Sequence, residues 1–180
     1  MKAWGATKSQ NGALKAQSIF DDMVLRYSQG DIDLKPDIVK YNTLIDAWAN
    51  AGEPERAEAI FRLLEQSGLK PDHRTYGTMI KAWGGSKSYN GGLKAQSIFD
   101  DMVLRYSQGD IDLKASIVTY NTLINAWANA GVPEQAEAIF RLMGQSGLKP
   151  DVISYNILVK AWSNAGRPDG ENVHKQFMIT

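Results

Sequence analysis

The chain lacks several of the groups on which protein chemistry often depends. It has no cysteine and only two histidines, His73 and His174, so it can form neither a disulfide nor a thiolate nucleophile, and it lacks the ligand spacing of a zinc site. No segment approaches the roughly 20 apolar residues of a membrane-spanning helix, and no charged-then-apolar leader opens the chain. We therefore expect no metal, no cofactor and no membrane span.

The chain also has no excess of charge of either sign. Lysine and arginine together number 20, and aspartate and glutamate also number 20. This balance weighs against a partner bound by bulk charge, because phosphate-driven affinity requires clustered basic side chains. Nucleic acid recognised by specific side chains remains open.

What the chain does contain is an internal repeat. The segment Leu14–Lys35 recurs later in the chain, without change, as Leu93–Lys114. The five tryptophans follow a finer period, with spacings of 44, 35, 44 and 35 residues. A period near 35 residues is the size of one helix–turn–helix unit, and such units bury a continuous core only by stacking on their neighbours. The sequence therefore predicts an all-α fold, an α-solenoid of stacked helix–turn–helix repeats.

Residues 38–72 form the clearest unit. Its first helix carries an apolar stripe at i, i+3, i+4 and i+7, which consists of Tyr41, Leu44, Ile45 and Trp48. Gly52 and Pro54 mark the end of this helix and the start of a second one, and Asp72 can cap the first helix of the next unit. Because every tryptophan lies on such a stripe, we expect these side chains to pack in the core and not to stack on bases.

The same pattern divides the whole chain into five units. They are a partial repeat (1–37), a repeat (38–72), a long repeat (73–116), a repeat (117–151) and a partial or capping repeat (152–180). The extra residues of the long repeat fall in the turn 84–92 and after the second helix, at 106–114. Met1 aligns with Ile80, in the middle of a helix pattern, so we expect a fragment that begins partway through a repeat. The last unit places polar residues where other units are apolar, which predicts a polar cap; these are Asn172, Lys175 and Gln176.

Two motifs suggest chemistry without completing it. The acidic pair Asp21-Asp22 and the Asp31–Asp33 segment, like their copies, have no histidine or further carboxylate to complete a metal site. Gly84–Ser88 does not satisfy the phosphate-loop pattern, and no apolar strand precedes it. No nucleophile–histidine–carboxylate set is present either, so we predict that the chain is not an enzyme and has no catalytic residues.

Three strings resemble the pentatricopeptide repeat (PPR) family: Ile117–Ile124 (IVTYNTLI), the turn Ala128–Gly131, and Gly147–Asp151 (GLKPD). The alternation of long and short units, with tryptophan late in the first helix, resembles PPR proteins of algal lineages. The resemblance implies single-stranded RNA as the partner, with one base per repeat read by two or three side chains. It also implies a role in RNA processing, stability or translation in the mitochondrion or chloroplast, alongside other RNA-processing proteins.

The resemblance further implies which residues meet the RNA. In the family the fifth and last residues of a unit meet the base edge, so Asn42 with Asp72 would prefer uracil. Asn121 with Asp151 would do the same. The residues that would pack against the base faces are Val39, Val118, Ile153 and, in the long unit, Arg74.

The two remaining units differ from this uracil pattern. The long unit offers Gly77 and Ser116, and because glycine has no side chain with which to read an edge, this unit should tolerate any base. Asn156 in the last unit would favour a pyrimidine. The expected RNA reads uracil, any base, uracil, pyrimidine.

Helix capping explains part of the same pattern. Asp72, Ser116 and Asp151 each precede a first helix, where aspartate and serine are favoured caps. Asn42 and Asn121 are harder to explain, because asparagine is a mediocre helix former and both lie on the face opposite the apolar stripe. They occupy the same place in two copies of one repeat, however, and one inherited choice copied once would also account for them. The alternative function is an α-solenoid scaffold that binds a peptide or protein in its groove.

Overall fold

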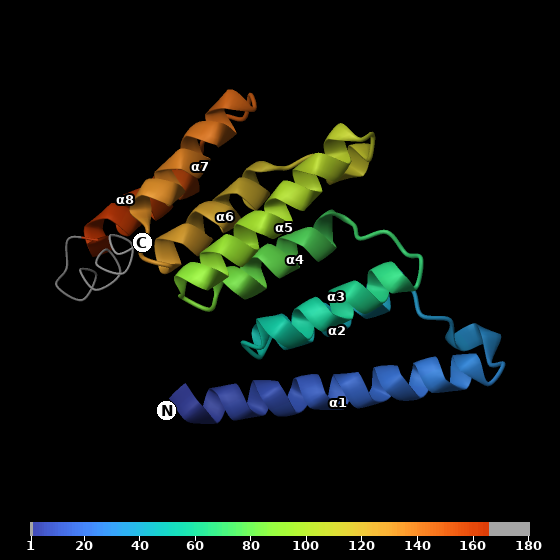
Figure 1. Ribbon diagram of the computed structural model, residues 1–180. Coiled ribbons are helices and arrows are strands. Elements are labelled where there is room, and N and C mark those ends of the chain that lie inside the picture. Colours follow the sequence, from blue (N-terminus) through green and yellow to red (C-terminus); the bar gives the residue numbers. More distant parts are fainter. Residues whose placement is uncertain (1, 166–180) are drawn as a thin grey trace, which may run out of the picture. The chain divides into compact units, whose positions relative to one another are not determined.

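The computed structural model describes the backbone of residues 2–165 and the side chains from residue 9 to residue 165. These residues contain helices and no strand (Figure 1). The elements are α1 (Lys2–Ser28), η1 (Ile32–Leu34), α2 (Ile38–Asn50), α3 (Pro54–Gln66), α4 (His73–Gly84), α5 (Tyr89–Ser107), η2 (Ile111–Leu113), α6 (Ile117–Asn129), α7 (Pro133–Gln145) and α8 (Val152–Ala165). The prediction of an all-α fold is confirmed. None of the described helices is long and apolar enough to cross a membrane.

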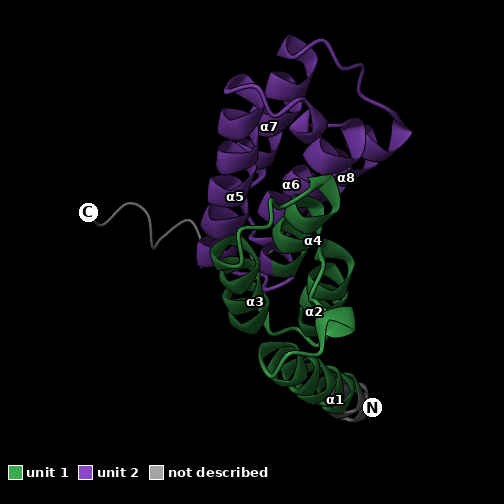
Figure 2. Cartoon of the chain, turned by 90° about the vertical axis from the view of Figure 1, so that its right-hand side faces the viewer, with its two compact units in different colours: residues 1–82 green, residues 83–180 purple. Residues whose placement is uncertain are grey.

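The chain forms two compact units, Met1–Ala82 and Trp83–Thr180, which Figure 2 colours separately. In the first unit α2 packs against both α1 and α3. The turn between α2 and α3 follows from the sequence: Gly52 adopts φ +75°, a conformation that glycine adopts without a steric penalty. The N–H of Gly52 donates to the carbonyl of Ala49 and that of Glu53 to the carbonyl of Trp48, so the turn satisfies carbonyls that the helix end leaves unpaired.

In the second unit α6 is the central helix, and α5, α7 and α8 all contact it. Ser116 caps α6 in a reciprocal capping box with Thr119, and Pro133 occupies the first turn of α7, where its missing N–H has no intrahelical partner to lose. The extra residues after α5 form η2, whose Leu113 is buried. The inserted segment thus packs on the protein through the side chain of Leu113, and the pattern of the helical repeat is unchanged.

A repeated aromatic contact joins each second helix to the first helix of the following repeat. In every case a phenylalanine meets a tyrosine edge to face, a favoured geometry for aromatic pairs. The pairs, with their ring-centroid distances, are Phe20–Tyr41 (4.9 Å), Phe61–Tyr76 (5.8 Å), Phe99–Tyr120 (5.0 Å) and Phe140–Tyr155 (5.1 Å). Each repeat is therefore stacked on its neighbour through the same side chains, as in an α-solenoid.

The tryptophans follow the expected core stripe with one exception among the described side chains. Trp48, Trp83 and Trp127 are buried. The indole N–H of Trp48 donates to Gln17 (3.0 Å), and that of Trp127 makes the same bond to Gln96 (3.1 Å). Trp162 on α8 is 44% exposed, so the prediction of core packing is wrong there. The side chain of Trp4 and the polar positions expected in the last unit lie outside the described residues.

The start of the chain, up to Ser28, folds differently from its near-copy, residues 80–107. In the copy α4 ends at Gly84, and Ser88 caps α5 by accepting a hydrogen bond from the N–H of Gly91 (3.0 Å). A Cβ on Gly91 would lie 2.6 Å from the backbone carbonyl oxygen of Trp83, so this turn requires glycine. At the start of the chain α1 runs on as one helix.

Two substitutions in this segment favour the continuous helix. Ala6 and Ala13 replace Gly85 and Gly92 of the copy, and each exchange of glycine for alanine favours helix by about 1 kcal/mol. A Cβ on Gly12, the counterpart of Gly91, would meet no other atom within 4 Å. At Gly12 the start of the chain therefore lacks the close contact that Gly91 makes in the copy.

Candidate nucleic-acid interface

The predicted site residues lie in the first turns of four helices or at their caps. Those on helices are Val39 and Asn42 (α2), Arg74 and Gly77 (α4), Val118 and Asn121 (α6), and Ile153 and Asn156 (α8). Ser116 is the N-cap of α6, and Asp72 and Asp151 immediately precede α4 and α8. The structure brings some of these residues together and leaves others apart.

Asn42 and Asp72, 30 residues apart in sequence, are in direct contact. The amide Nδ2 of Asn42 donates to both carboxylate oxygens of Asp72, at 3.1 and 3.3 Å. A third residue joins them: the hydroxyl of Thr75 lies 2.6 Å from the amide oxygen of Asn42. Asn42 is 4% exposed and Thr75 is fully buried. The expectation that Asn42 faces away from the protein interior is therefore wrong, because both ends of its amide are held by the start of the next repeat.

A second network repeats the first with one change of residue. The Nδ2 of Asn121 donates to Asp151 at 3.2 Å, and the hydroxyl of Ser154 lies 2.6 Å from the amide oxygen of Asn121. Asn121 is 8% exposed and Ser154 is fully buried. The same arrangement thus occurs twice, with threonine in one copy and serine in the other.

The two aspartates also cap helices, as the alternative interpretation predicted. The backbone N–H of Thr75 donates to Asp72 at 2.8 Å, and that of Ser154 donates to Asp151 at 2.8 Å. Capping and contact with asparagine therefore coexist in one carboxylate. In both networks Oδ1 takes the cap bond. A carboxylate oxygen has two lone pairs, so Oδ2, which accepts the Asn42 amide at 3.3 Å in the first network, can accept a further donor.

Both carboxylates are held ionised by these contacts. Partial burial is the largest single influence on Asp72 and opposes ionisation, but the hydrogen bonds from Thr75 and Asn42 together outweigh it and lower the pKa of Asp72. For Asp151 the backbone N–H of Ser154 is the largest influence, and with the Ser154 hydroxyl it lowers the pKa. Each network therefore presents a negative charge at neutral pH.

The long unit has no such network. Gly77 offers no side chain, and a Cβ placed on it would meet nothing within 4 Å. The Ser116 hydroxyl accepts a hydrogen bond from the N–H of Thr119 at 3.3 Å, and Thr119 reaches back to the N–H of Ser116, also at 3.3 Å. Gly77, at the fifth position of the long unit, supplies no side-chain amide to this cap.

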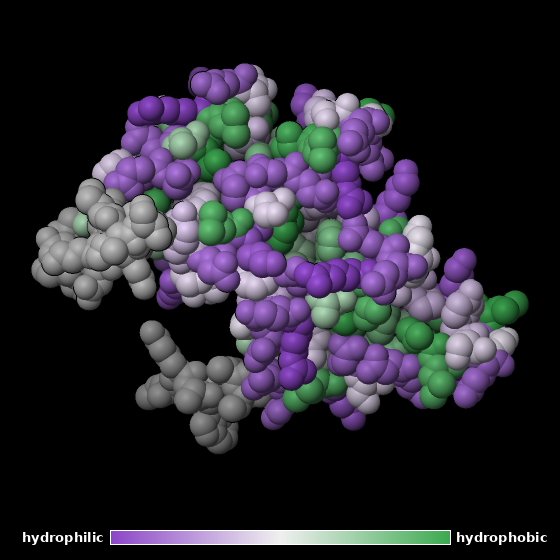
Figure 3. Space-filling view, viewed as in Figure 1, coloured by the Kyte–Doolittle hydropathy of each residue, from purple (hydrophilic) through white to green (hydrophobic). Residues whose placement is uncertain are grey.

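The predicted packing residues are apolar side chains left at the surface. Val39, Val118 and Ile153 are 61%, 71% and 59% exposed, although valine and isoleucine are usually buried. Arg74, at the equivalent position of the long unit, is exposed as well, and so is Asn156. The view in Figure 3 shows apolar surface as separate patches among polar residues. Val39 and Val118 each precede the network asparagine by three residues, so they lie on the same side of the helix.

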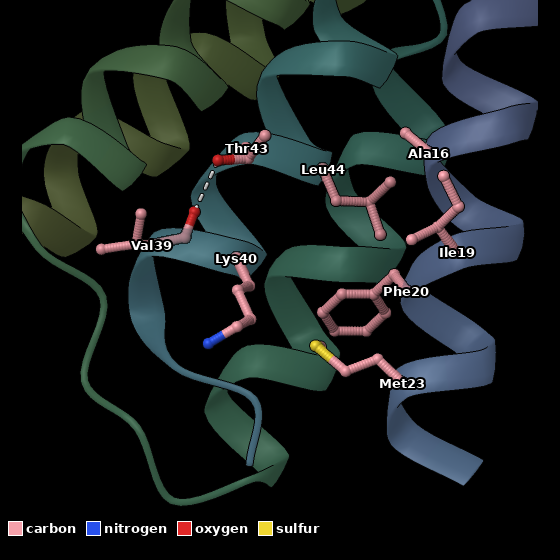
Figure 4. A pocket seen from close by; sticks show the side chains of 8 residues that line it. All are labelled: Ala16, Ile19, Phe20, Met23, Val39, Lys40, Thr43 and Leu44. Atoms are coloured by element: carbon pink, nitrogen blue, oxygen red, sulfur yellow. Dashed lines mark hydrogen bonds between the residues drawn. The ribbon is translucent and has the colours of Figure 1, made fainter. Parts of the chain in front are cut away.

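An apolar hollow of about 300 Å³ lies between α1 and α2, beside Val39. Figure 4 shows Phe20 and Met23 pointing from α1 toward α2, with Leu44 opposite them and Val39 at the edge. The hydroxyl of Thr43 donates to the carbonyl of Val39 at 2.7 Å, so it is not directed into the hollow. The hollow offers packing surface and no set of hydrogen-bonding groups.

Thr75 and Ser154 are the functional candidates that sequence reasoning missed. A hydroxyl in the first turn of a helix is a common cap partner, and neither residue belongs to the positions that the resemblance singled out. A signal was present, because a hydroxyl residue stands three places after the cap in three successive repeats, as Thr75, Thr119 and Ser154. Within residues 9–165 no cluster of three or more potential metal ligands occurs.

The stacked helix–turn–helix repeats, with polar networks at the starts of their first helices, define the class as helical-repeat α-solenoids. Residues 36–83 and 115–164, more than half of the chain, match the PPR repeat family. The chain therefore belongs to the PPR repeat family.

Solved structures agree with this assignment. The chain is similar to the pentatricopeptide repeat protein PPR10 from maize, with 26% identity and a TM-score of 0.70 over 96% of this chain and 23% of that one. It is also similar to PPR10 in complex with an 18-nt psaJ RNA element, with 25% identity and a TM-score of 0.64 over 80% of this chain and 20% of that one. The chain thus spans about a fifth of the length of PPR10. The comparison with curated proteins gave no match.

Proposed function

We propose that this chain binds single-stranded RNA through the first helices of its repeats, one base per repeat, with uracil preferred at two positions separated by one unconstrained base. The observation that carries the proposal is the recurrence of a buried asparagine–aspartate–hydroxyl network, at Asn42 and again at Asn121, each beside an exposed valine. Capping alone needs no buried amide, so the asparagines require a further explanation.

The chemistry of each network matches the edge of uracil. Each one places an amide N–H beside a carboxylate oxygen that can accept another hydrogen bond. Uracil presents the N3–H donor between two carbonyl acceptors, so the carboxylate can accept from N3–H while the amide donates to a carbonyl. Cytosine presents a bare N3 acceptor at the same place, which a carboxylate repels. The pair therefore favours uracil.

The exposed apolar residues supply the packing that a single strand needs. Val39, Val118 and Ile153 can lie against base faces, and contacts of this kind do not depend on base identity. Arg74 can stack its planar guanidinium on a base in the long unit. At Gly77 only packing remains, so this repeat tolerates any base. Asn156 adds a preference for a pyrimidine.

The crystal structure of PPR10 with an 18-nt RNA element supports RNA as the partner. As the family resemblance implies, we place the function in the mitochondrion or chloroplast, in RNA processing, stability or translation. The chain acts there by occupying a short single strand and recruiting other RNA-processing proteins, not by catalysis. Its neutral charge implies few phosphate contacts and therefore a shallow dependence of affinity on salt.

Selection from a randomised single-stranded RNA pool, followed by sequencing of the bound fraction, tests the proposal. The expected enrichment is uracil, any base, uracil, pyrimidine. The matched control carries Asn42→Ala and Asn121→Ala, which remove both amides and should abolish the uracil preference. Equal binding of poly-U and poly-A, or a preference that survives loss of both amides, would leave the peptide-binding scaffold as the better interpretation.

A further inference from the structure

We infer that the buried hydroxyls of Thr75 and Ser154 are specificity-determining positioning residues: they bind the carbonyl end of the network asparagine and thereby present its N–H end to the RNA base. This inference rests on the proposed RNA-binding function and assigns a role to two residues that do not themselves meet the base. It explains how an amide, which carries both a donor and an acceptor, can discriminate between bases.

The hydrogen-bond count shows which acceptor depends on the Thr75 hydroxyl. The oxygen Oγ1 lies 2.6 Å from Oδ1 of Asn42 and 2.8 Å from Oδ1 of Asp72, and a hydroxyl has one proton to donate. The Asp72 oxygen already accepts the N–H of Thr75 at 2.8 Å and the amide of Asn42 at 3.1 Å. The Asn42 oxygen has no other donor among the described residues and makes the shorter contact. The Thr75 hydroxyl is therefore the donor on which the Asn42 oxygen depends, and Asp72 shares it at the longer distance.

The same count holds in the second network. The Ser154 hydroxyl lies 2.6 Å from Oδ1 of Asn121 and 2.8 Å from Asp151, and the N–H of Ser154 already satisfies that carboxylate oxygen at 2.8 Å. Threonine and serine share the hydroxyl and differ by one methyl group. Their exchange between otherwise equivalent networks indicates that the hydroxyl is the shared functional group.

This arrangement determines which end of the amide is available. The carbonyl of Asn42 is held by the hydroxyl, one amide hydrogen is held by Asp72, and the second amide hydrogen has no partner among the described residues. An N–H selects a base that offers a carbonyl at that point, such as uracil, over one that offers an amino group, such as cytosine. Without the hydroxyl the buried carbonyl would lack a donor, a costly state, and would turn outward to water or to a base amino group.

The long unit provides an internal control. Thr119 occupies the position equivalent to Thr75 and is also buried, but it pairs with Ser116 in the capping box of α6. The preceding repeat, the long unit 73–116, carries Gly77 and no asparagine at its fifth position, so Thr119 has no network asparagine to hold. Removal of the Thr119 hydroxyl should therefore affect the stability of α6 and leave base choice unchanged.

The experiment compares wild type, Thr75→Val, Thr75→Ser and Thr119→Val by selection from the randomised RNA pool. Thr75→Val keeps the shape of the side chain and removes the hydroxyl. We expect the ratio of uracil to cytosine at the first uracil position to fall about three- to tenfold, which is the equivalent of one hydrogen bond. Thr75→Ser should keep the wild-type ratio, as Ser154 does in the other network. Because the ratio compares two bases on the same protein, partial unfolding of a variant does not change it.

The outcomes separate the two hypotheses. If wild type shows no uracil enrichment, the proposed function fails. If the wild type enriches uracil and Thr75→Val shows the same uracil-to-cytosine ratio as the wild type, the hydroxyl does not set the preference. The inference is then overturned. The inference would also be overturned if Thr119→Val lowered the uracil-to-cytosine ratio as much as Thr75→Val does. The effect would then come from helix stability.

Discussion

Asp72 combines two roles that one pair of substitutions can separate. Its Oδ1 caps α4 by accepting the N–H of Thr75 at 2.8 Å, and its carboxylate accepts the amide of Asn42 at 3.1 and 3.3 Å. Replacement by alanine removes both interactions. Replacement by serine restores the cap, as Ser116 shows for α6, but leaves Asn42 without its carboxylate.

The expected magnitudes follow from these contacts. Loss of an N-cap costs about 0.5–2 kcal/mol, and leaving the buried Asn42 amide without its acceptor costs about 1–3 kcal/mol. Asp72→Ala should therefore lower the free energy of unfolding by about 1.5–5 kcal/mol. Asp72→Ser should lower it by about 0.5–2 kcal/mol less, because the cap survives. Both variants should lose the uracil preference at the base that faces Asn42.

Urea denaturation followed by circular dichroism measures the stabilities, and selection from the randomised RNA pool measures base choice. Asp37→Ala is the matched control, because Asp37 caps α2 by accepting the N–H of Lys40 at 2.9 Å and has no asparagine partner among the described residues. It should lose about 0.5–2 kcal/mol with unchanged base choice. If Asp72→Ser keeps the full uracil preference, the carboxylate does not read the base and capping is its whole role.

Two other predictions address pH and the long unit. Folding lowers the pKa of Asp72 and Asp151 below the ordinary 3.8. Their contribution to stability is therefore present above the unfolded-state pKa and is lost as the pH falls through the lower folded-state values. The urea midpoint should decrease in acid, and it should decrease less steeply once both aspartates are replaced by asparagine. The double change Gly77→Asn with Ser116→Asp should create a uracil preference at the unconstrained position, since a Cβ at Gly77 meets nothing within 4 Å; RNA selection that still returns any base there would contradict this.

The resemblance to the PPR family paired Asn42 with Asp72, as the fifth and last residues of one unit. Once the length of the repeat is known, the end of one unit must meet the start of the next, and the structure places the two side chains in hydrogen-bond contact. The burial of Asn42 could not be predicted in this way, because a helical pattern shows which face carries apolar residues but not which polar face a neighbouring repeat covers. Thr75 was missed for the same reason.

The helix α1 shows a different limit of sequence reasoning. Most of the segment up to Ser28 is identical to residues 80–107, yet it forms one helix where the copy forms a turn between two helices. The turn in the copy depends on close contacts: a Cβ on Gly92 would lie 2.8 Å from the ring of Trp127. Ala13 stands at that place in α1 and is buried. The methyl group of Ala13, at the place of Gly92, thus helps to decide between a turn and a continuous helix. A comparison of the two sequences counts it as one small substitution.

The duplicated block, one long repeat followed by one short repeat, leads to a final prediction about longer arrays. Each block supplies one asparagine–aspartate–hydroxyl network and one long unit without such a network. A preference for uracil should therefore recur at every second base. Inserting a further copy of residues 73–151 after Asp151 adds one block in register, and a solenoid accepts such an insertion because each repeat contacts only its neighbours. The enlarged protein should enrich a third uracil two bases beyond the second.

The insertion adds two repeats and therefore two bound bases at about 1–3 kcal/mol each, so the affinity should rise by about 30-fold to 20,000-fold. A matched insertion with Asn→Ala in the added network should gain only the packing part of this increase and show no third uracil. Fluorescence anisotropy with labelled RNA measures both proteins. An enlarged array that binds no more tightly than the original would mean that its repeats do not each engage a base, and the one-base-per-repeat mechanism would fail for this chain.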